Sequence, residues 1–146
     1  MKTEGEILIV DDNPADVDLA CEALSQGTTP THVSSVGDGA EAIAFLKRDG
    51  KYASAKHPHL IVLDLNLPRK DGRSVLAEVK SDPKLRRTPV VVFSTSRAPR
   101  DITSSFELGA NSYVSKPGDL EGFLSAIGAI ERFWFDCASL PHEEDE

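Results

Sequence analysis

The chain has 146 residues, 40% hydrophobic and 27% charged, a composition typical of one soluble domain with one core. Its net charge of −8 argues against a nucleic-acid-binding surface, which needs clustered lysine and arginine. We find no apolar run that could span a membrane, no signal peptide and no CxxC pair, so we expect a cytoplasmic protein without a membrane partner, whose two cysteines stay reduced.

Short apolar runs alternate with longer amphipathic stretches along the chain. The apolar runs predict five strands, at residues 7–10, 32–36, 60–63, 90–94 and 112–114. The stretches between and after them predict five helices, which run from Pro14 to Gly27, from Gly39 to about Gly50, from Gly72 past Val79, from about Pro99 to Leu108, and from Asp119 or Leu120 to beyond Phe133. Pro14 suits the first turn of a helix, because its missing N–H would have no partner there.

Continuous apolar strands between amphipathic helices predict a parallel sheet that is covered on both faces. Right-handed crossovers between the strands then give an α/β fold with a doubly wound, five-stranded parallel sheet. No repeat, low-complexity segment or linker divides the chain, so we predict a single domain over residues 1–146. Its core is expected at about residues 5–136, and residues 137–146 are expected to form a solvated acidic tail.

Polar and charged residues follow four of the five predicted strands. They are Asp11 and Asp12 after the first strand, Asp64 and Asn66 after the third, Ser94 at the end of the fourth, and Lys116 after the fifth. In an open α/β sheet, ligands bind outside the carboxyl ends of the strands. We therefore expect these side chains to meet at one edge of the sheet.

The three carboxylates narrow the chemistry of this edge. Neighbouring carboxylates repel one another unless a cation lies between them. Oxygen ligands with room for water favour Mg²⁺ over zinc or copper. The ammonium of Lys116 supplies a further positive charge, available either to Asp64 or to an oxygen of an incoming phosphoryl group. The pattern indicates a site where a carboxylate attacks phosphorus.

Each of these motifs alone has an ordinary structural explanation. An Asp-Asp pair after a strand is more often a helix cap than a metal site. A single strand-end serine such as Ser94, or a single Lys-Pro pair such as Lys116-Pro117, carries little information. The functional interpretation depends on the joint occurrence of the motifs at the ends of alternating strands.

One set of residues resembles, in order and spacing, the receiver domain of bacterial response regulators over about residues 5–136. The set comprises Asp11-Asp12, Asp64, Ser94, Tyr113 and Lys116-Pro117. The resemblance implies a flavodoxin-like (βα)5 fold with strand order 2-1-3-4-5. It also implies a signalling protein and not an enzyme, with catalysis limited to its own phosphorylation and slow dephosphorylation.

The resemblance implies a phosphoryl site and a metal site that share residues. Asp64 is the expected phosphoacceptor, and the phosphohistidine of a partner sensor histidine kinase is the expected donor. Mg²⁺ is expected to bind directly to Asp12 and Asp64, mainly through water to Asp11, and to the backbone carbonyl of Asn66.

Other matching residues are implied to respond to phosphorylation. Ser94 is expected to hydrogen-bond the phosphoryl group and Lys116 to form an ion pair with it, while the rotamer of Tyr113 follows the movement of Ser94. Asn66 and Ser96 stand where the family tunes the rate of hydrolysis. The expected result is a changed surface on the fourth helix and fifth strand.

Three segments are similar to the small single-domain regulators that pair with bacterial phytochromes, the red-light sensor kinases. They are residues 64–72, with the sequence DLNLPRKDG, the polar insert before His59, and residues 130–135, with the sequence IERFWF. This narrower resemblance implies a bacteriophytochrome-like kinase as the partner, with another sensor kinase as the alternative. The output is a protein contact, onward transfer to a downstream phosphotransfer protein, or use as a phosphate sink.

The last predicted helix carries more apolar residues than one stripe needs. The stripe that we expect to pack on the sheet is Phe123, Ile127, Ile130 and Trp134, and the additional residues are Leu120, Leu124, Phe133 and Phe135. The surplus indicates either a thick core contact or a homodimer interface. Related light-linked regulators dimerise through this region, which favours an interface containing Leu124, Phe133, Trp134 and Phe135.

Two other functions would use the same acceptor residue. Haloacid-dehalogenase-type phosphatases attack with a strand-end aspartate such as Asp64, but they need a second aspartate two residues later, where this chain has Asn66. A binding module with a degenerate acceptor site is disfavoured, because the expected acceptor, metal-binding and phosphoryl-binding residues are all present.

Overall fold

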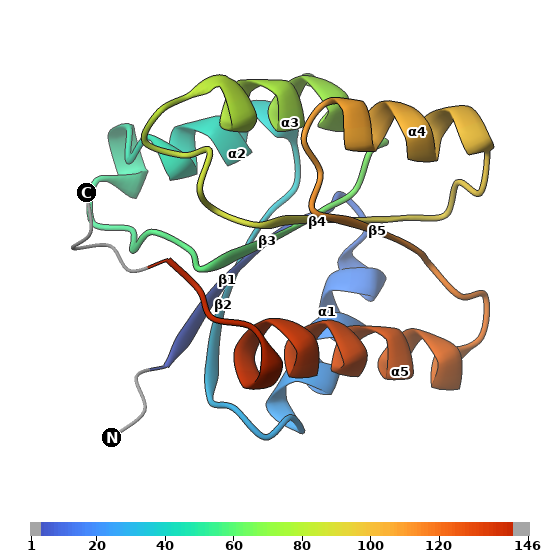
Figure 1. Cartoon of the computed structure of the whole chain (residues 1–146). Coiled ribbons are helices and arrows are strands. Elements are labelled where there is room, and N and C mark those ends of the chain that lie inside the picture. Colours follow the sequence, from blue (N-terminus) through green and yellow to red (C-terminus); the bar gives the residue numbers. More distant parts are fainter. Residues whose placement is uncertain (1–3, 142–146) are drawn as a thin grey trace.

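The computed structural model describes residues 4–141, which form three layers with a parallel sheet in the middle (Figure 1). The predicted acidic tail therefore lies partly outside the described residues. The strands of the sheet are β1 (Gly5–Val10), β2 (Thr31–Val36), β3 (Leu60–Leu63), β4 (Val90–Ser94) and β5 (Ser112–Ser115). Their spatial order is β2-β1-β3-β4-β5 and every neighbouring pair is parallel, which confirms the expected doubly wound α/β fold.

The central strands are apolar along their whole length because both faces of the sheet are covered. In β1, Leu8 points to one face of the sheet and Ile9 to the other, and both are buried. β1 and β3 pair with Val10 beside Leu63. This register brings the ends of the two strands level, so the residues that follow them lie side by side.

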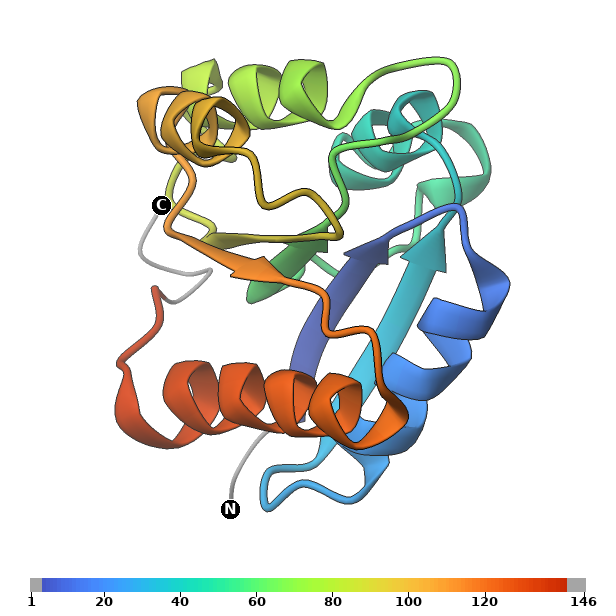
Figure 2. The ribbon, with the colours of Figure 1, turned by 90° about the vertical axis from the view of Figure 1, so that its right-hand side faces the viewer.

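Helices cover both faces of the sheet (Figure 2). They are α1 (Pro14–Ser25), α2 (Gly39–Leu46), α3 (Gly72–Ser81), α4 (Pro99–Glu107) and α5 (Leu120–Glu131). α1 and α5 lie on one face, over the core that contains Val62 and Ile127. α2, α3 and α4 lie on the other face, where Leu63 and Leu76 belong to a second core.

The second helix is shorter than predicted. α2 ends at Leu46 and not near Gly50, because Arg48 adopts a left-handed backbone conformation with φ of 57°. A short 3-10 turn, η1 (Gly50–Tyr52), takes up the residues that the prediction had placed at the end of the helix and just after it.

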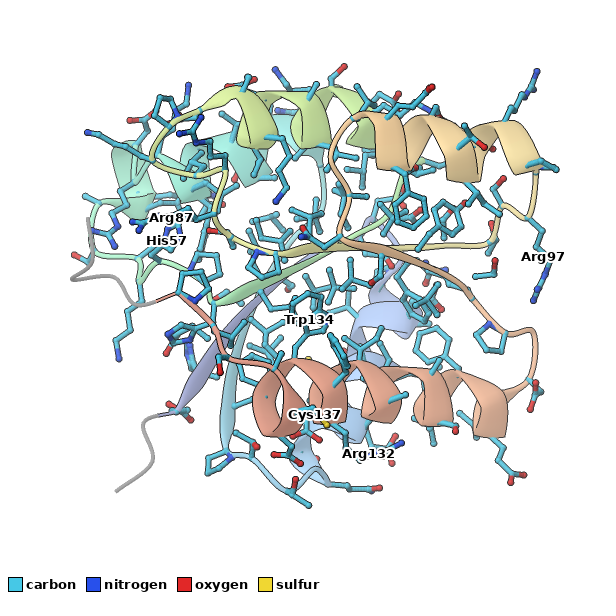
Figure 3. The ribbon with its side chains drawn as sticks, viewed as in Figure 1. His57, Arg87, Arg97, Arg132, Trp134 and Cys137 are labelled. Atoms are coloured by element: carbon cyan, nitrogen blue, oxygen red, sulfur yellow. The ribbon has the colours of Figure 1, made fainter. Side chains whose placement is uncertain are left out.

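The last helix extends beyond Phe133 as predicted, but its final part has a different hydrogen-bond pattern. After α5, residues Arg132–Cys137 form a π-helical segment, η2. There the amide of Ala138 donates to the carbonyl of Phe133 at 2.8 Å, a bond that spans five residues. The side chain of Trp134 lies between η2 and the sheet and packs on the core (Figure 3).

The predicted dimer interface is largely engaged within the chain itself. Of its four residues, Leu124, Trp134 and Phe135 are partly buried against the core that α1 and α5 cover. Phe133 is the exception, with 54% of its surface exposed. The dimer stays a prediction, and among the four predicted interface residues only Phe133 is largely exposed in this structure.

The two cysteines lie on separate elements. Cys21 of α1 is half-buried and Cys137 of η2 is exposed, and both are free. Burial raises the pKa of the Cys21 thiol, which keeps it protonated at neutral pH. Within residues 4–141, no helix is both long enough and apolar enough to cross a lipid bilayer.

Candidate functional site

Three aspartates gather at the carboxyl ends of β1 and β3. Carboxylate oxygens of Asp11, Asp12 and Asp64 lie within 4.8 Å of one another. Asp11 and Asp64 are each only 8% exposed, whereas Asp12 faces solvent. Strand pairing holds the two buried residues in place, since the Asp11 amide donates to the carbonyl of Val36 at 3.1 Å and the Asp64 amide to that of Val10 at 2.9 Å.

The helix that follows β1 is capped by an asparagine and not by the Asp-Asp pair. The side-chain oxygen of Asn13 accepts hydrogen bonds from the amides of Ala15 at 3.0 Å and Asp16 at 3.2 Å. The amide of Asn13 donates in turn to Oδ1 of Asp11 at 2.9 Å, which fixes the orientation of that carboxylate. The helix-cap explanation of the Asp-Asp pair is therefore wrong.

A buried ammonium group joins the acidic cluster from the end of β5. The Nζ atom of Lys116 donates to Oδ2 of Asp11 at 2.8 Å, to Oδ2 of Asp16 at 2.8 Å and to Oδ2 of Asp64 at 3.2 Å. The backbone amide of Lys116 donates to the carbonyl of Ser94 at 2.7 Å, which anchors the start of its side chain beside β4. Asp16, in the first turn of α1, is a partner that the sequence pattern did not identify.

Burial and neighbouring charges act against each other in this cluster. Burial by itself would lower the pKa of Lys116, but its hydrogen bonds to Asp11 and Asp16 and the charges of Asp11 and Asp64 raise that pKa well above its ordinary value. Burial raises the pKa of Asp11, and the hydrogen bonds from Lys116 and from the Asn13 amide offset only part of this effect. The carboxylates outnumber the single ammonium, so a further cation would stabilise the cluster.

The donor set fits a hard divalent cation. In the described part of the chain, Asp11, Asp12 and Asp64 form the group of potential metal-binding side chains that is tight enough to share one ion. They offer oxygen alone, which suits Mg²⁺, Mn²⁺ or Ca²⁺ better than zinc or copper. The amide of Asn66 donates to Oδ1 of Asp64 at 3.3 Å and so places Asn66 next to the cluster, while the role of its carbonyl as a ligand stays a prediction.

The two predicted switch residues both contact the loop between β4 and α4. Ser94 is fully buried at the end of β4, and its Oγ accepts a hydrogen bond from the amide of Ser96 at 3.3 Å. Tyr113 is half-buried on β5, and its hydroxyl donates to the carbonyl of Ser96 at 2.9 Å. A displacement of Ser96 would therefore change the hydrogen bonds of both side chains.

Ser96 also begins a chain of polar contacts that the sequence pattern did not identify. Its hydroxyl donates to Oδ2 of Asp101 at 2.5 Å, and Nη2 of Arg73 donates to Oδ1 of the same carboxylate at 2.6 Å. These contacts join the β4–α4 loop to the first turns of α4 and α3. Arg97, in the same loop, instead extends away from the molecule (Figure 3).

This chain of contacts predicts a pH-dependent contribution of Asp101 to stability. The hydroxyl of Ser96 and then the guanidinium of Arg73 hold the pKa of Asp101 below its ordinary value of 3.8. A carboxyl group whose pKa falls on folding stabilises the fold above its unfolded-state pKa, and this contribution disappears as the pH drops through its folded-state pKa. The Asp101→Asn variant should therefore be less stable than the wild type at neutral pH, and the difference should shrink once the pH falls below 3.8.

Urea unfolding of both proteins over a series of pH values measures this difference. Glu107→Gln, at the exposed end of the same helix, is the matched control for the loss of one charge. A difference between Asp101→Asn and the wild type that stays constant down to low pH would contradict the prediction.

The chain is similar in sequence to known signalling proteins. The family model of the response regulator receiver domain matches residues 7–128. The response regulator Rcp1 of Synechocystis sp. is 44% identical over 135 residues, which cover 92% of this chain and 92% of that protein. Residues 7–128 contain the four strand ends that carry the acidic cluster, Ser94 and Lys116.

Solved structures show the same fold over nearly the whole chain. The phosphorylated cyanobacterial phytochrome response regulator RcpA has a TM-score of 0.93 at 49% identity, and the alignment covers 96% of this chain and 100% of that one. The Mn²⁺-bound form of Rcp1 has a TM-score of 0.91 at 43% identity, with 94% and 99% covered. The bacteriophytochrome response regulator RtBRR has a TM-score of 0.75 at 36% identity, with 97% and 86% covered.

Proposed function

This chain belongs to the response regulator receiver domain family, a family of signalling proteins, and we therefore propose that it accepts a phosphoryl group on Asp64. One observation carries the proposal. The buried carboxylate of Asp64 lies within 4.8 Å of two other aspartates and accepts a hydrogen bond from Lys116 at 3.2 Å. An acceptor oxygen between a cation site and an ammonium suits attack on phosphorus, because negative charge must be stabilised on the phosphoryl oxygens.

The proposed cation is Mg²⁺, held by Asp12 and Asp64, with Asp11 acting mainly through water and the carbonyl of Asn66 as a further ligand. When bound, Mg²⁺ would supply positive charge that stabilises the phosphoryl oxygens. The oxygen-only donor set supports this assignment. The Mn²⁺-bound form of the relative Rcp1 supports a divalent ion.

In the proposed reaction, an oxygen of Asp64 attacks the phosphorus of a phosphohistidine on a partner kinase, in line with the P–N bond. The O–P bond forms as the P–N bond breaks, and the imidazole nitrogen keeps the electron pair. Lys116 and Ser94 then bind oxygens of the phosphoryl group. Attack of water on the phosphoaspartate regenerates Asp64, at a rate that we expect Asn66 and Ser96 to tune.

The proposed signal leaves the site through the hydroxyl of Ser94. If this hydroxyl turns toward the phosphoryl group, it gives up its hydrogen bond with the amide of Ser96. Ser96 also contacts the hydroxyl of Tyr113 and the carboxylate of Asp101, so the movement reaches β5 and the start of α4. These two elements form the surface whose change we propose as the output.

The proposed phosphodonor is a sensor histidine kinase of the bacteriophytochrome type, because the relatives RcpA and RtBRR are phytochrome and bacteriophytochrome response regulators. The proposal includes a cytoplasmic location, since a histidine kinase takes its phosphoryl group from ATP. A downstream phosphotransfer protein is a further proposed partner. A homodimer through Phe133 and its neighbours Leu124, Trp134 and Phe135 completes the proposal.

Intact mass spectrometry after incubation with acetyl phosphate and Mg²⁺ tests this function. We expect the wild type to gain the mass of one phosphoryl group, Asp64→Asn to gain none, and a chelator to abolish the gain. Asp18→Asn, which removes an exposed carboxylate from α1 near the site, should gain the same mass as the wild type. Phosphorylation of Asp64→Asn would contradict the proposal, and no gain by the wild type with acetyl phosphate or a phosphorylated kinase would indicate a degenerate binding module.

A further inference from the structure

All three hydrogens of the Lys116 ammonium are engaged by carboxylates. An ammonium group has three donors and no acceptor, and here the three acceptors are Asp11, Asp16 and Asp64. The contacts with Asp11 and Asp16 are 2.8 Å long, whereas that with Asp64 is 3.2 Å. The ammonium is therefore held more closely to the β1–α1 segment than to the proposed acceptor.

Asp16 differs from the other two carboxylates in its position. It is not one of the three aspartates that are close enough to share a metal ion. It lies in the first turn of α1, where its amide bonds to the side chain of Asn13 at 3.2 Å and the helix backbone fixes its place. Its side chain is 22% exposed, against 4% for Lys116, so solvent can stabilise its charge if the lysine moves away.

A phosphoryl group on Asp64 needs the same ammonium. Charge-assisted hydrogen bonds are directional, and the ammonium group of a lysine has only three N–H donors. A new bond from Lys116 to a phosphoryl oxygen therefore replaces one of the three that the structure shows. The 3.2 Å contact with Asp64 is already the longest, so the ammonium must move toward Asp64 to donate to a phosphoryl oxygen there. Asp11 is buried and adjoins the cation site, which leaves Asp16 as the partner whose bond is most readily given up in that movement.

We propose, on the basis of the proposed function, that Asp16 is a positioning residue that competes with the phosphoryl group for Lys116. In the unphosphorylated protein, Asp16 holds the ammonium toward α1. After phosphorylation, Lys116 turns from Asp16 to the phosphoryl oxygen. Asp16 thereby weakens the ion pair between Lys116 and the phosphoryl group.

Beryllofluoride, a stable mimic of the phosphoryl group, gives a direct test at saturating Mg²⁺. Isothermal titration calorimetry should show that Asp16→Asn binds beryllofluoride about tenfold more tightly than the wild type, since Lys116 then leaves a neutral amide oxygen and not a carboxylate with which it forms an ion pair. Asp18→Asn, on the same helix, is the matched control for the removal of one negative charge. We expect its affinity to stay within about twofold of the wild type, because long-range effects of exposed charges are screened.

Two further measurements separate competition from general electrostatics. Affinity for Mg²⁺ alone should fall in Asp16→Asn, because this variant removes a negative charge that contacts the Lys116 ammonium, and should stay within about twofold of the wild type in Asp18→Asn, whose exposed charge is screened. Asp16→Glu keeps a carboxylate within reach of Lys116 and should return the beryllofluoride affinity toward that of the wild type. If Asp16→Asn does not fold, Asp16→Ser provides the same comparison with a smaller side chain.

The inference is overturned if Asp16→Asn binds beryllofluoride no more tightly than Asp18→Asn. Weaker binding of beryllofluoride by Asp16→Asn than by the wild type would show that Asp16 instead holds Lys116 in a position that favours its bond to the phosphoryl group. If the wild type itself neither binds beryllofluoride nor gains phosphoryl mass, it is the proposed function that fails, so the two failures are distinguishable.

Discussion

Replacing Lys116 with methionine is expected to lower the free energy of unfolding by about 3–5 kcal/mol in metal-free buffer at neutral pH. Methionine keeps the apolar stem of the side chain and removes the ammonium that three carboxylates share. Two of these carboxylates, those of Asp11 and Asp64, are buried and would lose their neutralising partner. Breaking a buried ion pair from one side is strongly destabilising, because the remaining charge is neither hydrated nor paired.

This loss of stability should depend on the charge of the cluster. Saturating Mg²⁺ should reduce the difference in free energy of unfolding between Lys116→Met and the wild type, because a cation bound to the same aspartates replaces part of the missing positive charge. Acidification from about pH 7 toward pH 4 should also reduce this difference in stability, because burial raises the pKa of Asp11 and protonation of Asp11 removes part of the unpaired charge.

Urea unfolding in chelator and in excess Mg²⁺ measures the effect of the Lys116→Met substitution. Lys56→Met is the matched control, since Lys56 is exposed and reaches Glu6 only at 3.9 Å. An exposed ion pair of this kind contributes at most about 1 kcal/mol, so the control should stay close to the wild type in both buffers. Two results would refute this neutralising role of Lys116. One is equal stability of Lys116→Met and Lys56→Met in chelator, and the other is a difference between Lys116→Met and the wild type that does not change with Mg²⁺.

Substitution of Gly72 by alanine is the second change with a large expected effect. A Cβ atom at this position would lie 2.3 Å from the carbonyl oxygen of Asp64 and 2.6 Å from Cα of Leu65. Both contacts are with backbone atoms, which cannot move away by a change of rotamer as a flexible side chain can. The amide of Gly72 also donates to the carbonyl of Leu65 at 2.9 Å, which ties the start of α3 to the end of β3.

We expect Gly72→Ala to destabilise the fold by about 2–3 kcal/mol, because the backbone after β3 must shift to admit the methyl group. The same shift displaces Asp64 from Lys116, so phosphorylation by acetyl phosphate should slow markedly. Gly118→Ala is the control, because nothing lies within 4 Å of a Cβ atom there and its backbone is not left-handed. This control should change stability by at most about 0.5 kcal/mol. If Gly72→Ala had the stability and the phosphorylation rate of the wild type, this result would contradict the close approach of Gly72 to the backbone of Asp64 and Leu65.

The strands were predictable because a strand that is buried on both faces of a sheet has an uninterrupted apolar sequence. The runs at Ile7–Val10 and at Leu60–Leu63 are apolar without interruption, and in the structure they lie within β1 and β3. Helix ends were less predictable, because local backbone conformation decides them. Nothing in the residue type of Arg48 predicts its left-handed backbone, and yet that conformation ends α2 before Gly50.

The residue types that follow each strand can be taken directly from the amino-acid sequence, and the carboxyl ends of parallel strands lie at one edge of the sheet. This is why the order of residues along the chain was enough to predict the approach of Asp11, Asp64 and Lys116. The sequence could not determine which helix-start charges turn inward, because an aspartate in a first helical turn looks the same whether it is solvated or buried. Only the packing of α1, α3 and α4 around that edge brings Asp16 to the ammonium and Arg73 to Asp101, since these contacts join residues whose meeting depends on how the helices cross the sheet.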